Sequence, residues 1–146
     1  MRVVRLTKRR HVGLDGAGAA ITGGRWNSPG KRVMYAASCS ARAIVEYLAH
    51  LDTLPAGLIL MLIEIPDTLE IERVHLQPAD VAASRQIGDD WLESKSTVAM
   101  EVPSVFAPRQ KNYLINPGHP MIGAIRIVES NPFAFDSRLL SSIPPA

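Results

Sequence analysis

The sequence predicts a single compact α+β domain with a β-sheet core and flanking helices. Two segments carry this prediction: residues 41–51 repeat apolar side chains at helical spacing, and residues 58–65 form a continuous apolar run of strand length. The 146-residue chain contains no internal repeat and has an ordinary size for one domain. We therefore expect one domain over residues 1–146, with residues 136–146 as a frayed tail.

Composition restricts the class of protein. Hydrophobic residues make up 47% of the chain and charged residues 21%, which is typical of a soluble globular protein. The single cysteine, Cys39, excludes an internal disulfide framework and suits a reducing cytoplasm. The longest apolar run, residues 57–63, is too short to span a bilayer, and no signal sequence is evident. The sequence therefore predicts a cytoplasmic protein that does not enter a membrane.

Basic charge is concentrated at the N-terminus. Eight of the 16 lysines and arginines lie in residues 1–32, where Asp15 is the only acidic residue. Such a segment can hold the phosphates of a nucleotide or of a nucleic-acid backbone, and charge alone does not separate the two. No aromatic ladder accompanies these basic residues, which favours a small molecule with a diphosphate over a nucleic acid. We therefore predict no direct binding of nucleic acid.

The N-terminal segments predict a strand followed by a loop. Residues 2–6 are mostly apolar and predict the first strand. Residues 7–22 are rich in glycine, which destabilises helices, and predict a long loop. This loop contains neither the dinucleotide-binding pattern G-x-G-x-x-G nor a P-loop, so doubly wound nucleotide-binding folds are disfavoured.

The candidate site residues begin at a glycine pair. Two consecutive glycines precede Arg25 and Trp26, and they allow the backbone to approach a ligand closely. Arg25 is at least as suited to an anion contact as to a solvated surface position. Residues 31–35 predict a short strand that ends at Tyr35, whose alternative role is that of an ordinary half-buried strand tyrosine.

A helix around residues 41–51 carries the candidate carboxylate, Glu46. Ser38 or Ser40 is expected as its N-cap. The helical period places Glu46 beside the apolar stripe, where a carboxylate can meet a ligand and still be partly desolvated. The alternative is a simple ion pair with Arg42, one helical turn earlier. The predicted core-facing stripe consists of Ala41, Ile44, Val45, Leu48 and Leu51.

The second half of the chain adds strands, a helix and two further candidates. Strands are predicted at residues 58–65, 68–74, 97–102, 113–115, 124–128 and 132–135, and a helix within residues 77–95. Trp91 is expected to anchor that helix in the core. Ser104 follows a strand end, which is a common place for a functional hydroxyl, and it is better suited to donate a hydrogen bond to a substrate than to attack one. The alternative is a serine that stabilises a turn. Asn116, before a proline, is expected to bind its own turn.

The histidines give no metal signal. All four lie on different predicted segments, and no pair of them has the spacing of metal ligands. We therefore predict no metal site.

Several of these segments occur in the order found in a known family. GGRWNSPG, VMYAAS, the helix with AIVEYLAHL, VPS and NYLINPGHP resemble the RES-domain toxins of bacterial toxin–antitoxin pairs, over nearly the whole chain. The family is named for an arginine, a glutamate and a serine, which match Arg25, Glu46 and Ser104. The resemblance implies an ADP-ribosyltransferase-like fold with a mixed or antiparallel sheet.

The resemblance also implies an activity, with NAD as substrate and no metal. Cleavage of the bond between nicotinamide and ribose creates positive charge on the sugar, which Glu46 would stabilise. Arg25 would bind the diphosphate. ADP-ribose would then pass to a protein, phosphate or water. The other residues implied at the NAD site are Trp26, Tyr35, Ser104 and Asn116.

The resemblance further implies a partner, an Xre-like antitoxin that covers the active site. Two other functions stay open. The basic N-terminal third suggests a ribonuclease toxin, and a nucleotide-binding regulatory module without chemistry would use Arg25 only for phosphate. Release of free nicotinamide from NAD would separate both from the enzymatic hypothesis.

Overall fold

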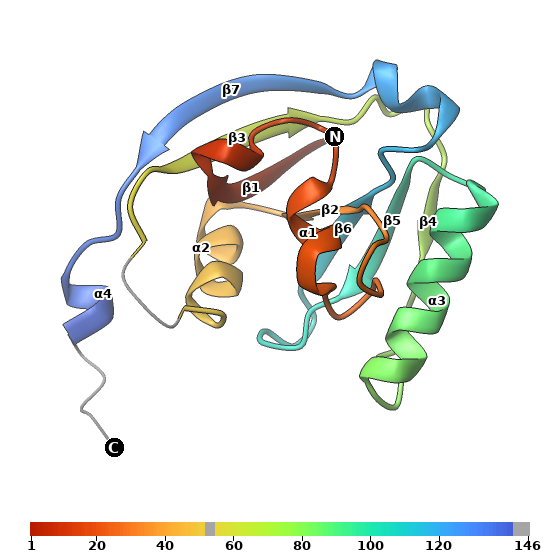
Figure 1. Cartoon of the computed structure of the whole chain (residues 1–146), viewed down its shortest axis with the longest axis horizontal. Helices are drawn as coiled ribbons and strands as arrows, with labels where there is room; N and C mark the ends of the chain where they lie inside the picture. The colour runs from red at the N-terminus through yellow and green to blue at the C-terminus, as the bar shows by residue number, and fades with distance from the viewer. Residues whose placement is uncertain (52–54, 142–146) are drawn as a thin grey trace.

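A computed structural model describes residues 1–51 and 55–141 (Figure 1). The chain forms one seven-stranded sheet of order β4-β5-β6-β2-β1-β3-β7. Neighbouring strands are antiparallel except for β4 and β5, which are parallel. The predicted α+β fold with a mixed sheet is thus confirmed.

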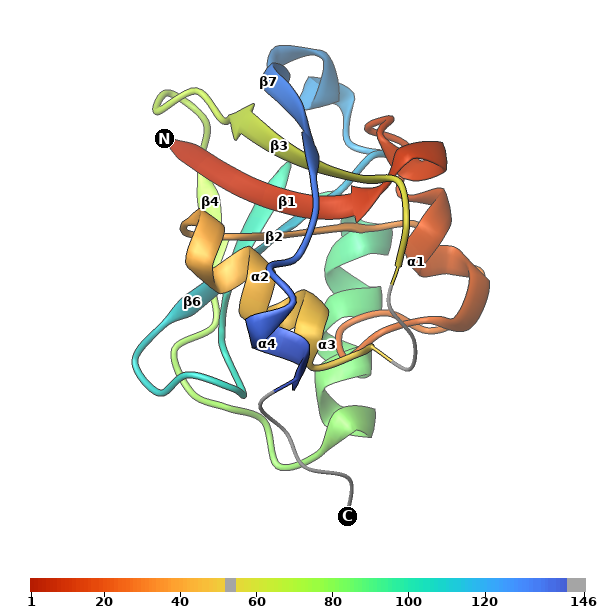
Figure 2. The ribbon, with the colours of Figure 1, turned by 90° about the vertical axis from the view of Figure 1, so that its left-hand side faces the viewer.

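The elements follow one another in an order that the sequence predicts in outline. They are β1 (Arg2–Lys8), η1 (Arg9–His11), α1 (Ala17–Thr22), β2 (Met34–Ala37), α2 (Ser40–Leu48), β3 (Leu58–Glu64), β4 (Ile71–Arg73), α3 (Val81–Ser94), β5 (Ala99–Pro103), β6 (Lys111–Ile115), η2 (Pro120–Ala124), β7 (Arg126–Phe133) and α4 (Arg138–Ser141). Figure 2 shows β1 and β3 side by side, with α2 below them. No helix in the described ranges is both long and apolar enough to cross a bilayer.

Helices α2 and α3 pack on the same face of the sheet. Residues paired directly in antiparallel strands point to one face, and the pairs Val4 with Ala37 and Ala37 with Asn112 therefore share a face. Helix α2 packs on this face through Ala43, which joins Val4 and Ala37 in one core cluster.

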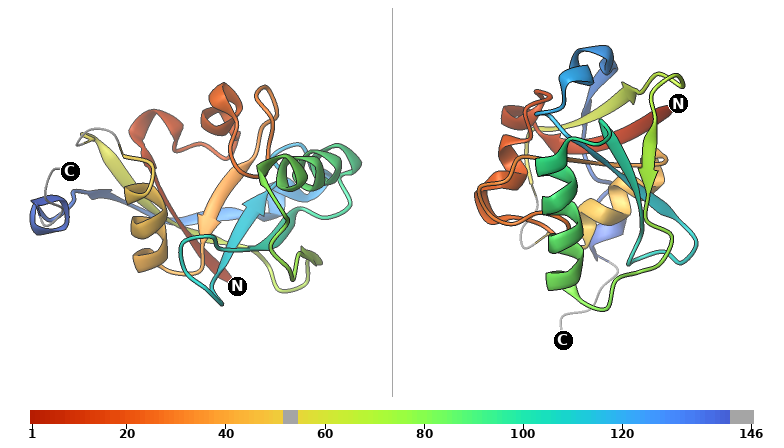
Figure 3. Two further views of the ribbon diagram at one scale, coloured as in Figure 1. Left: turned by 90° about the horizontal axis from the view of Figure 1, so that it is seen from below. Right: turned by 90° about the vertical axis from the view of Figure 1, so that its right-hand side faces the viewer.

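Helix α3 reaches the same face further along β2 and β6. Tyr35 and Leu114 are paired, and they lie two residues from Ala37 and Asn112, so they point the same way. Trp91 of α3 packs in one cluster with both. Seen from below, β2 and β6 lie between α2 and α3 (Figure 3, left). Both helices therefore pack against β2 on this face of the sheet.

Helix α3 has clear start and stop signals. The side chain of Asp80 accepts a hydrogen bond from the backbone N–H of Ala83 at 2.8 Å, which caps the first turn. Lys95 ends the helix in a left-handed conformation with φ of 52°. Trp91 is buried, as predicted, and its indole N–H donates to Thr97 Oγ1 at 2.9 Å.

The prediction of a loop over residues 7–22 is wrong, because this segment contains α1. Gly16 precedes the helix with φ of 65°, and a Cβ there would lie 2.7 Å from the Val33 nitrogen. A six-residue helix is unstable alone. Here the side chain of Asn27 donates to Ala19 O at 3.0 Å, and Gly30 N–H donates to Ala20 O at 2.8 Å. Contacts from the following loop therefore stabilise this helix.

The side chains through which α2 faces the core differ from the predicted core-facing stripe. Ala41 and Val45 are exposed, whereas Ala43, Ile44 and Tyr47 pack on the sheet. The cause is long-range, since Phe133 and Phe135 from the far end of the chain join this cluster and the ring of Phe135 packs on Tyr47.

The start of α2 also differs from the prediction. Strand β2 continues past Tyr35 to Ala37, and the N-cap is Cys39 rather than Ser38 or Ser40. The side chain of Cys39 makes no capping hydrogen bond.

One strand, β7, replaces the two short strands predicted near the C-terminus. It pairs with β3 from Arg126 to Phe133, and the register shifts between Leu62 and Ile63, where Val128 is left without a partner on β3. The polar residues 129–131, which separate the two predicted strands, are paired with Leu62, Met61 and Leu60, so the strand continues through them. Within the predicted tail, residues 138–141 form α4, while residues 142–146 lie outside the described part.

Candidate functional site

Four polar side chains from α2, the end of β5 and the start of β6 form one hydrogen-bonded group. We term Arg42, Glu46, Ser104 and Asn112 the Glu46 cluster. Oε1 of Glu46 accepts from Arg42 Nη2 at 2.6 Å, from Asn112 Nδ2 at 2.8 Å and from Ser104 Oγ at 3.0 Å. Among the described residues no donor bonds to Oε2, and the Glu46 side chain is 24% exposed. One oxygen is therefore held while the other stays available to a ligand.

The strand register explains why these four residues meet. Val102 and Asn112 are paired in β5 and β6, so Ser104 lies at the start of the loop that joins the two strands. Asn112 is also paired with Ala37, and α2 begins three residues later. The helix therefore runs back over the start of β6, and its second turn brings Glu46 onto Asn112.

Arg42 is the most buried member of the cluster. Its residue is 6% exposed, and Nη2 also donates to Ser104 Oγ and, at 3.4 Å, to Asn112 Oδ1. The alternative of an ion pair between Arg42 and Glu46 is thus correct as a contact. The pair is part of a larger cluster, because two further donors reach the same carboxylate.

The Arg25 loop, residues 23–30, is held rigidly except at Arg25 itself. Tyr35 Oη accepts from Trp26 N–H at 3.0 Å and donates to Asn27 Oδ1 at 2.6 Å. Asn27 Nδ2 donates in turn to Lys31 O at 2.8 Å. Within residues 1–51 and 55–141 the half-buried Arg25 side chain has no hydrogen bond or ion pair. The loop therefore presents a free guanidinium on a fixed backbone.

Helix α3 holds the same loop from the other side. Arg85 Nε donates to Gly24 O at 2.8 Å. Asp89 accepts from Ser28 N–H at 3.0 Å and from Ser28 Oγ at 2.5 Å. A Cβ on Gly88 would lie only 1.7 Å from Trp26 O, so helix and loop backbones are in direct contact. Gly88 was not among the predicted site residues, although a glycine inside a helix is a signal of close packing.

The structure brings Glu46 and Ser104 together, and places Arg25 on a neighbouring loop. Among the residues that the structure describes, no hydrogen bond or ion pair joins Arg25 to the Glu46 cluster. The Arg25 loop is attached to α3 and covers Tyr35, whereas Glu46 extends from α2, and both elements lie on one face of the sheet. On this face, the Arg25 loop and α2 approach the strands β2 and β6 from different directions (Figure 3).

The side chains of two further predicted site residues, Trp26 and Asn116, are buried. Trp26 is 3% exposed, and its side chain packs in the core with Trp91. Asn116 is also buried, where it donates to Leu92 O at 3.1 Å and accepts from Gly118 N–H at 2.9 Å. These contacts are those of a core side chain and a turn. Asn116 lies four residues after Asn112 in an extended chain, about 13 Å along the strand direction.

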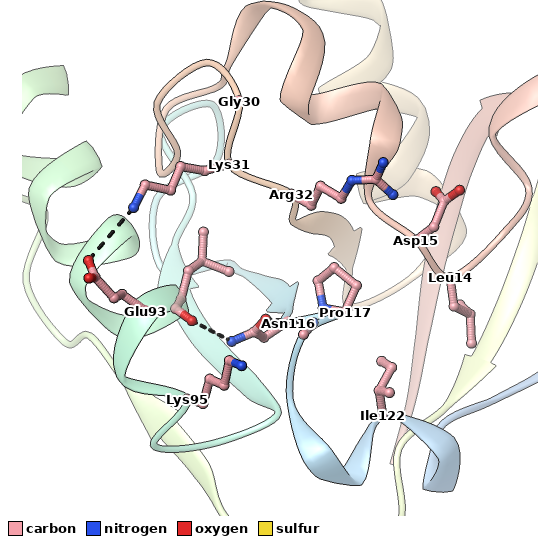
Figure 4. A pocket seen from close by; sticks show the side chains of 12 residues that line it. Leu14, Asp15, Gly30, Lys31, Arg32, Glu93, Lys95, Asn116, Pro117 and Ile122 are labelled. Carbon is pink, nitrogen blue, oxygen red and sulfur yellow. Dashed lines mark hydrogen bonds and ion pairs between the residues drawn. The ribbon is translucent and has the colours of Figure 1, made fainter.

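Asn116 lines a cavity that is distinct from the Glu46 cluster. The cavity has a volume of about 640 Å³ and lies between the loop before β2, the end of α3 and the turn after β6 (Figure 4). No member of the Glu46 cluster is among its lining residues. Lys31, Arg32 and Lys95 bring positive charge to this cavity, and part of that charge is neutralised by Glu93, whose Oε2 lies 3.7 Å from Lys31 Nζ. In the part of the chain described here, no three His, Cys, Asp or Glu side chains gather as metal ligands.

Tyr35 connects the Arg25 loop to stability at alkaline pH. Burial raises the pKa of Tyr35 to about 12, and the hydrogen bond from Trp26 N–H opposes this rise. Because the pKa of an unfolded tyrosine is about 10, the folded protein holds this proton more tightly, and the free energy of unfolding falls as pH rises from about 10 to about 12. Tyr35→Phe is expected to lose less stability over this range.

Urea unfolding at several pH values above about 9 would measure this difference in slope. The pKa of Tyr113 is also raised, by burial and by its hydrogen bond to Glu101, but Tyr113 is present in both proteins and cancels in the comparison. Equal slopes for the two proteins would contradict the prediction.

The fold of this chain is shared with a solved structure. The fold resembles that in the crystal structure of the M. tuberculosis MbcT–MbcA toxin–antitoxin complex, with a TM-score of 0.71, covering 91% of this chain and 84% of the matched chain. The sequences are 17% identical, so this likeness concerns the fold. The protein is thus an α+β domain of the kind found in that complex.

The family follows from the sequence. The RES domain profile matches residues 2–136, and the chain belongs to the RES-domain family, as the resemblance predicted. It is 36% identical over 139 residues to the Prs ADP-ribosylating toxin of Sphingobium sp., covering 87% of this chain and 86% of that protein. It is 35% identical over 137 residues to Toxin Res of Pseudomonas putida, covering 88% of this chain and 94% of that protein.

Proposed function

We propose that this chain is the toxin of a bacterial toxin–antitoxin pair and that it cleaves the bond between nicotinamide and ribose in NAD. ADP-ribose then passes to a protein, phosphate or water. The observation that carries this proposal is the Glu46 carboxylate, which has one oxygen held by three donors and the other open to a ligand. The name of the Sphingobium relative, an ADP-ribosylating toxin, supports the same chemistry.

Glu46 acts on the charge that develops during cleavage. As nicotinamide leaves, the ribose becomes an oxocarbenium-like cation, and a carboxylate already in position stabilises it without reorganisation. Three donors on Oε1 leave Oε2 to accept a ribose hydroxyl. Ser104 donates to Glu46, so its role in this mechanism is to hold the carboxylate at the ribose.

Arg25 binds the diphosphate of NAD. Its guanidinium is free and its backbone is held by Tyr35, Arg85 and Asp89, so little conformational freedom is lost when a phosphate binds. The planar guanidinium fork matches two phosphate oxygens better than an ammonium does. Tyr35 and Trp26 support this loop, and Asn116 belongs to the turn after β6.

An antitoxin covers this site and thereby keeps the toxin inactive. Apolar side chains are exposed beside the Glu46 cluster, with Val105 and Phe106 directly after Ser104 and Val45 next to Glu46 on α2. Exposed apolar side chains that lie next to one another on a surface mark sites of protein–protein interaction. From the resemblance we propose a helical, Xre-like partner. NAD turnover by a complex of the two proteins, equal to that of the free chain, would contradict this role.

Mass spectrometry of the products tests the enzymatic proposal. The chain is incubated with NAD, phosphate and a cell extract, and we expect free nicotinamide together with ADP-ribose, ADP-ribose phosphate or a modified protein. A parallel incubation with RNA should leave the RNA intact. A folded protein that degrades RNA, or that binds NAD without releasing nicotinamide, would support one of the two alternatives instead.

Arg25→Ala should weaken NAD binding as well as turnover, because it removes a charge-assisted contact to the diphosphate. The expected loss in kcat/KM is about 10- to 100-fold. Arg126→Ala is the matched control, since Arg126 is exposed on β7 and pairs with Glu64 at 2.8 Å. Equal kcat/KM values for wild type and Arg25→Ala would remove Arg25 from the mechanism.

A further inference from the structure

Arg42 is buried in an unusual way. It is 6% exposed, and two of its guanidinium nitrogens, Nε and Nη1, have no hydrogen-bond partner among the described residues. Both atoms are shielded from solvent. Buried donors without partners cost stability, and in native proteins such groups are rare enough that each calls for an explanation. The position of Arg42 therefore needs a reason other than stability.

That reason lies in its third nitrogen. Nη2 is within hydrogen-bonding distance of Glu46 Oε1 at 2.6 Å, of Ser104 Oγ, and of Asn112 Oδ1 at 3.4 Å. It thus contacts every other member of the Glu46 cluster. Ser104 and Asn112 bind the same oxygen of Glu46, but they are neutral, so Arg42 supplies the only positive charge in the cluster.

We propose that Arg42 is a positioning residue that holds Oε1 of Glu46, so that Oε2 faces the substrate. This inference rests on the proposed NAD cleavage. Arg42 does not touch NAD, because its free nitrogens are shielded from solvent. Its effect falls on the step in which the ribose becomes positively charged, and therefore on kcat rather than on KM.

Two substitutions separate charge from packing. Arg42→Met fills a similar volume and removes the unsatisfied donors, and apolar replacement of a buried charge is often tolerated. Glu46 keeps two donors and part of its solvent contact in this variant. Arg42→Lys retains the positive charge without the planar fork. The matched control is Arg126→Met, which breaks the ion pair to Glu64 on the surface.

The test measures kcat and KM for nicotinamide release from NAD by the full chain. We expect kcat of Arg42→Met to fall about 10- to 100-fold with KM within about twofold, Arg42→Lys to lie between this variant and wild type, and Arg126→Met to match wild type. An unchanged kcat for Arg42→Met would overturn the proposal. A raised KM at unchanged kcat would also overturn it, because it would indicate direct binding.

A second measurement does not depend on turnover. In a double-mutant cycle of Arg42→Met and Glu46→Ala, each of which removes the bond between the two side chains, the changes in the free energy of unfolding should be non-additive if Arg42 holds Glu46. Additive changes would overturn the positioning role. If the wild-type chain releases no nicotinamide, the proposed function fails, while the cycle still decides whether Arg42 holds the carboxylate.

Discussion

Glu46→Gln is expected to lower kcat for nicotinamide release by about 100- to 1,000-fold while the protein stays folded. Glutamine has nearly the same shape, so its carbonyl oxygen can still accept from Arg42, Ser104 and Asn112. The side chain then has no charge to stabilise the ribose cation. Because the substitution acts on the transition state, KM should change little. Steady-state kinetics with NAD measure kcat and KM, and a thermal unfolding curve of the same sample shows that the variant is folded.

Glu64→Gln provides the matched control. Glu64 is a comparably exposed glutamate, at 28%, and it also accepts from an arginine, Arg126, at 2.8 Å. It lies on β3, away from the Glu46 cluster. We expect its variant to retain wild-type kcat. If Glu46→Gln retains full turnover, Glu46 is not the catalytic carboxylate, whatever the control does.

Gly88→Ala is expected to impair both stability and NAD binding. The added Cβ would lie 1.7 Å from the carbonyl oxygen of Trp26, and a backbone atom cannot move aside as a flexible side chain can. Either α3 or the Arg25 loop must shift, at a cost of about 1–3 kcal/mol or more in the free energy of unfolding. A displaced loop also moves Arg25, so KM for NAD should rise. Urea unfolding and steady-state kinetics measure the two effects.

Gly123→Ala is the control for this substitution. Gly123 lies in η2, and a Cβ there would meet no atom within 4 Å. Its variant should be as stable and as active as the wild type. Wild-type stability and KM for Gly88→Ala would show that α3 does not hold the Arg25 loop by direct backbone contact.

Much of the secondary structure was predictable, because its signals are local. The strand with the strongest apolar run became β3, and the helix that contains Trp91 became α3, with Trp91 in the core. The loop prediction over residues 7–22 failed, since α1 depends on bonds from Asn27 and Gly30 that no local pattern reveals. The core-facing line of α2 was also wrong, because Phe133 and Phe135 decide it from the far end of the chain.

In the candidate site, too, some contacts could be predicted from the sequence and others depend on the tertiary structure. The spacing of four residues between Arg42 and Glu46 predicts their contact, since these positions lie on adjacent turns of one helix. Nothing in the sequence pattern points to Asn112, whose place beside Glu46 follows from its pairing with Ala37. The requirement for a glycine at position 88 likewise follows only from its contact with the backbone of Trp26, which is 62 residues away in the chain.

By itself, the sequence determined the fold class, the family and the residue types available for chemistry. Those properties follow from local periodicity and from motifs read along the chain. Only the tertiary structure decided which oxygen of Glu46 stays open and which backbone holds Arg25. The reason is physical: strand register and helix packing bring together groups that are far apart in sequence, and these contacts depend on the whole folded chain.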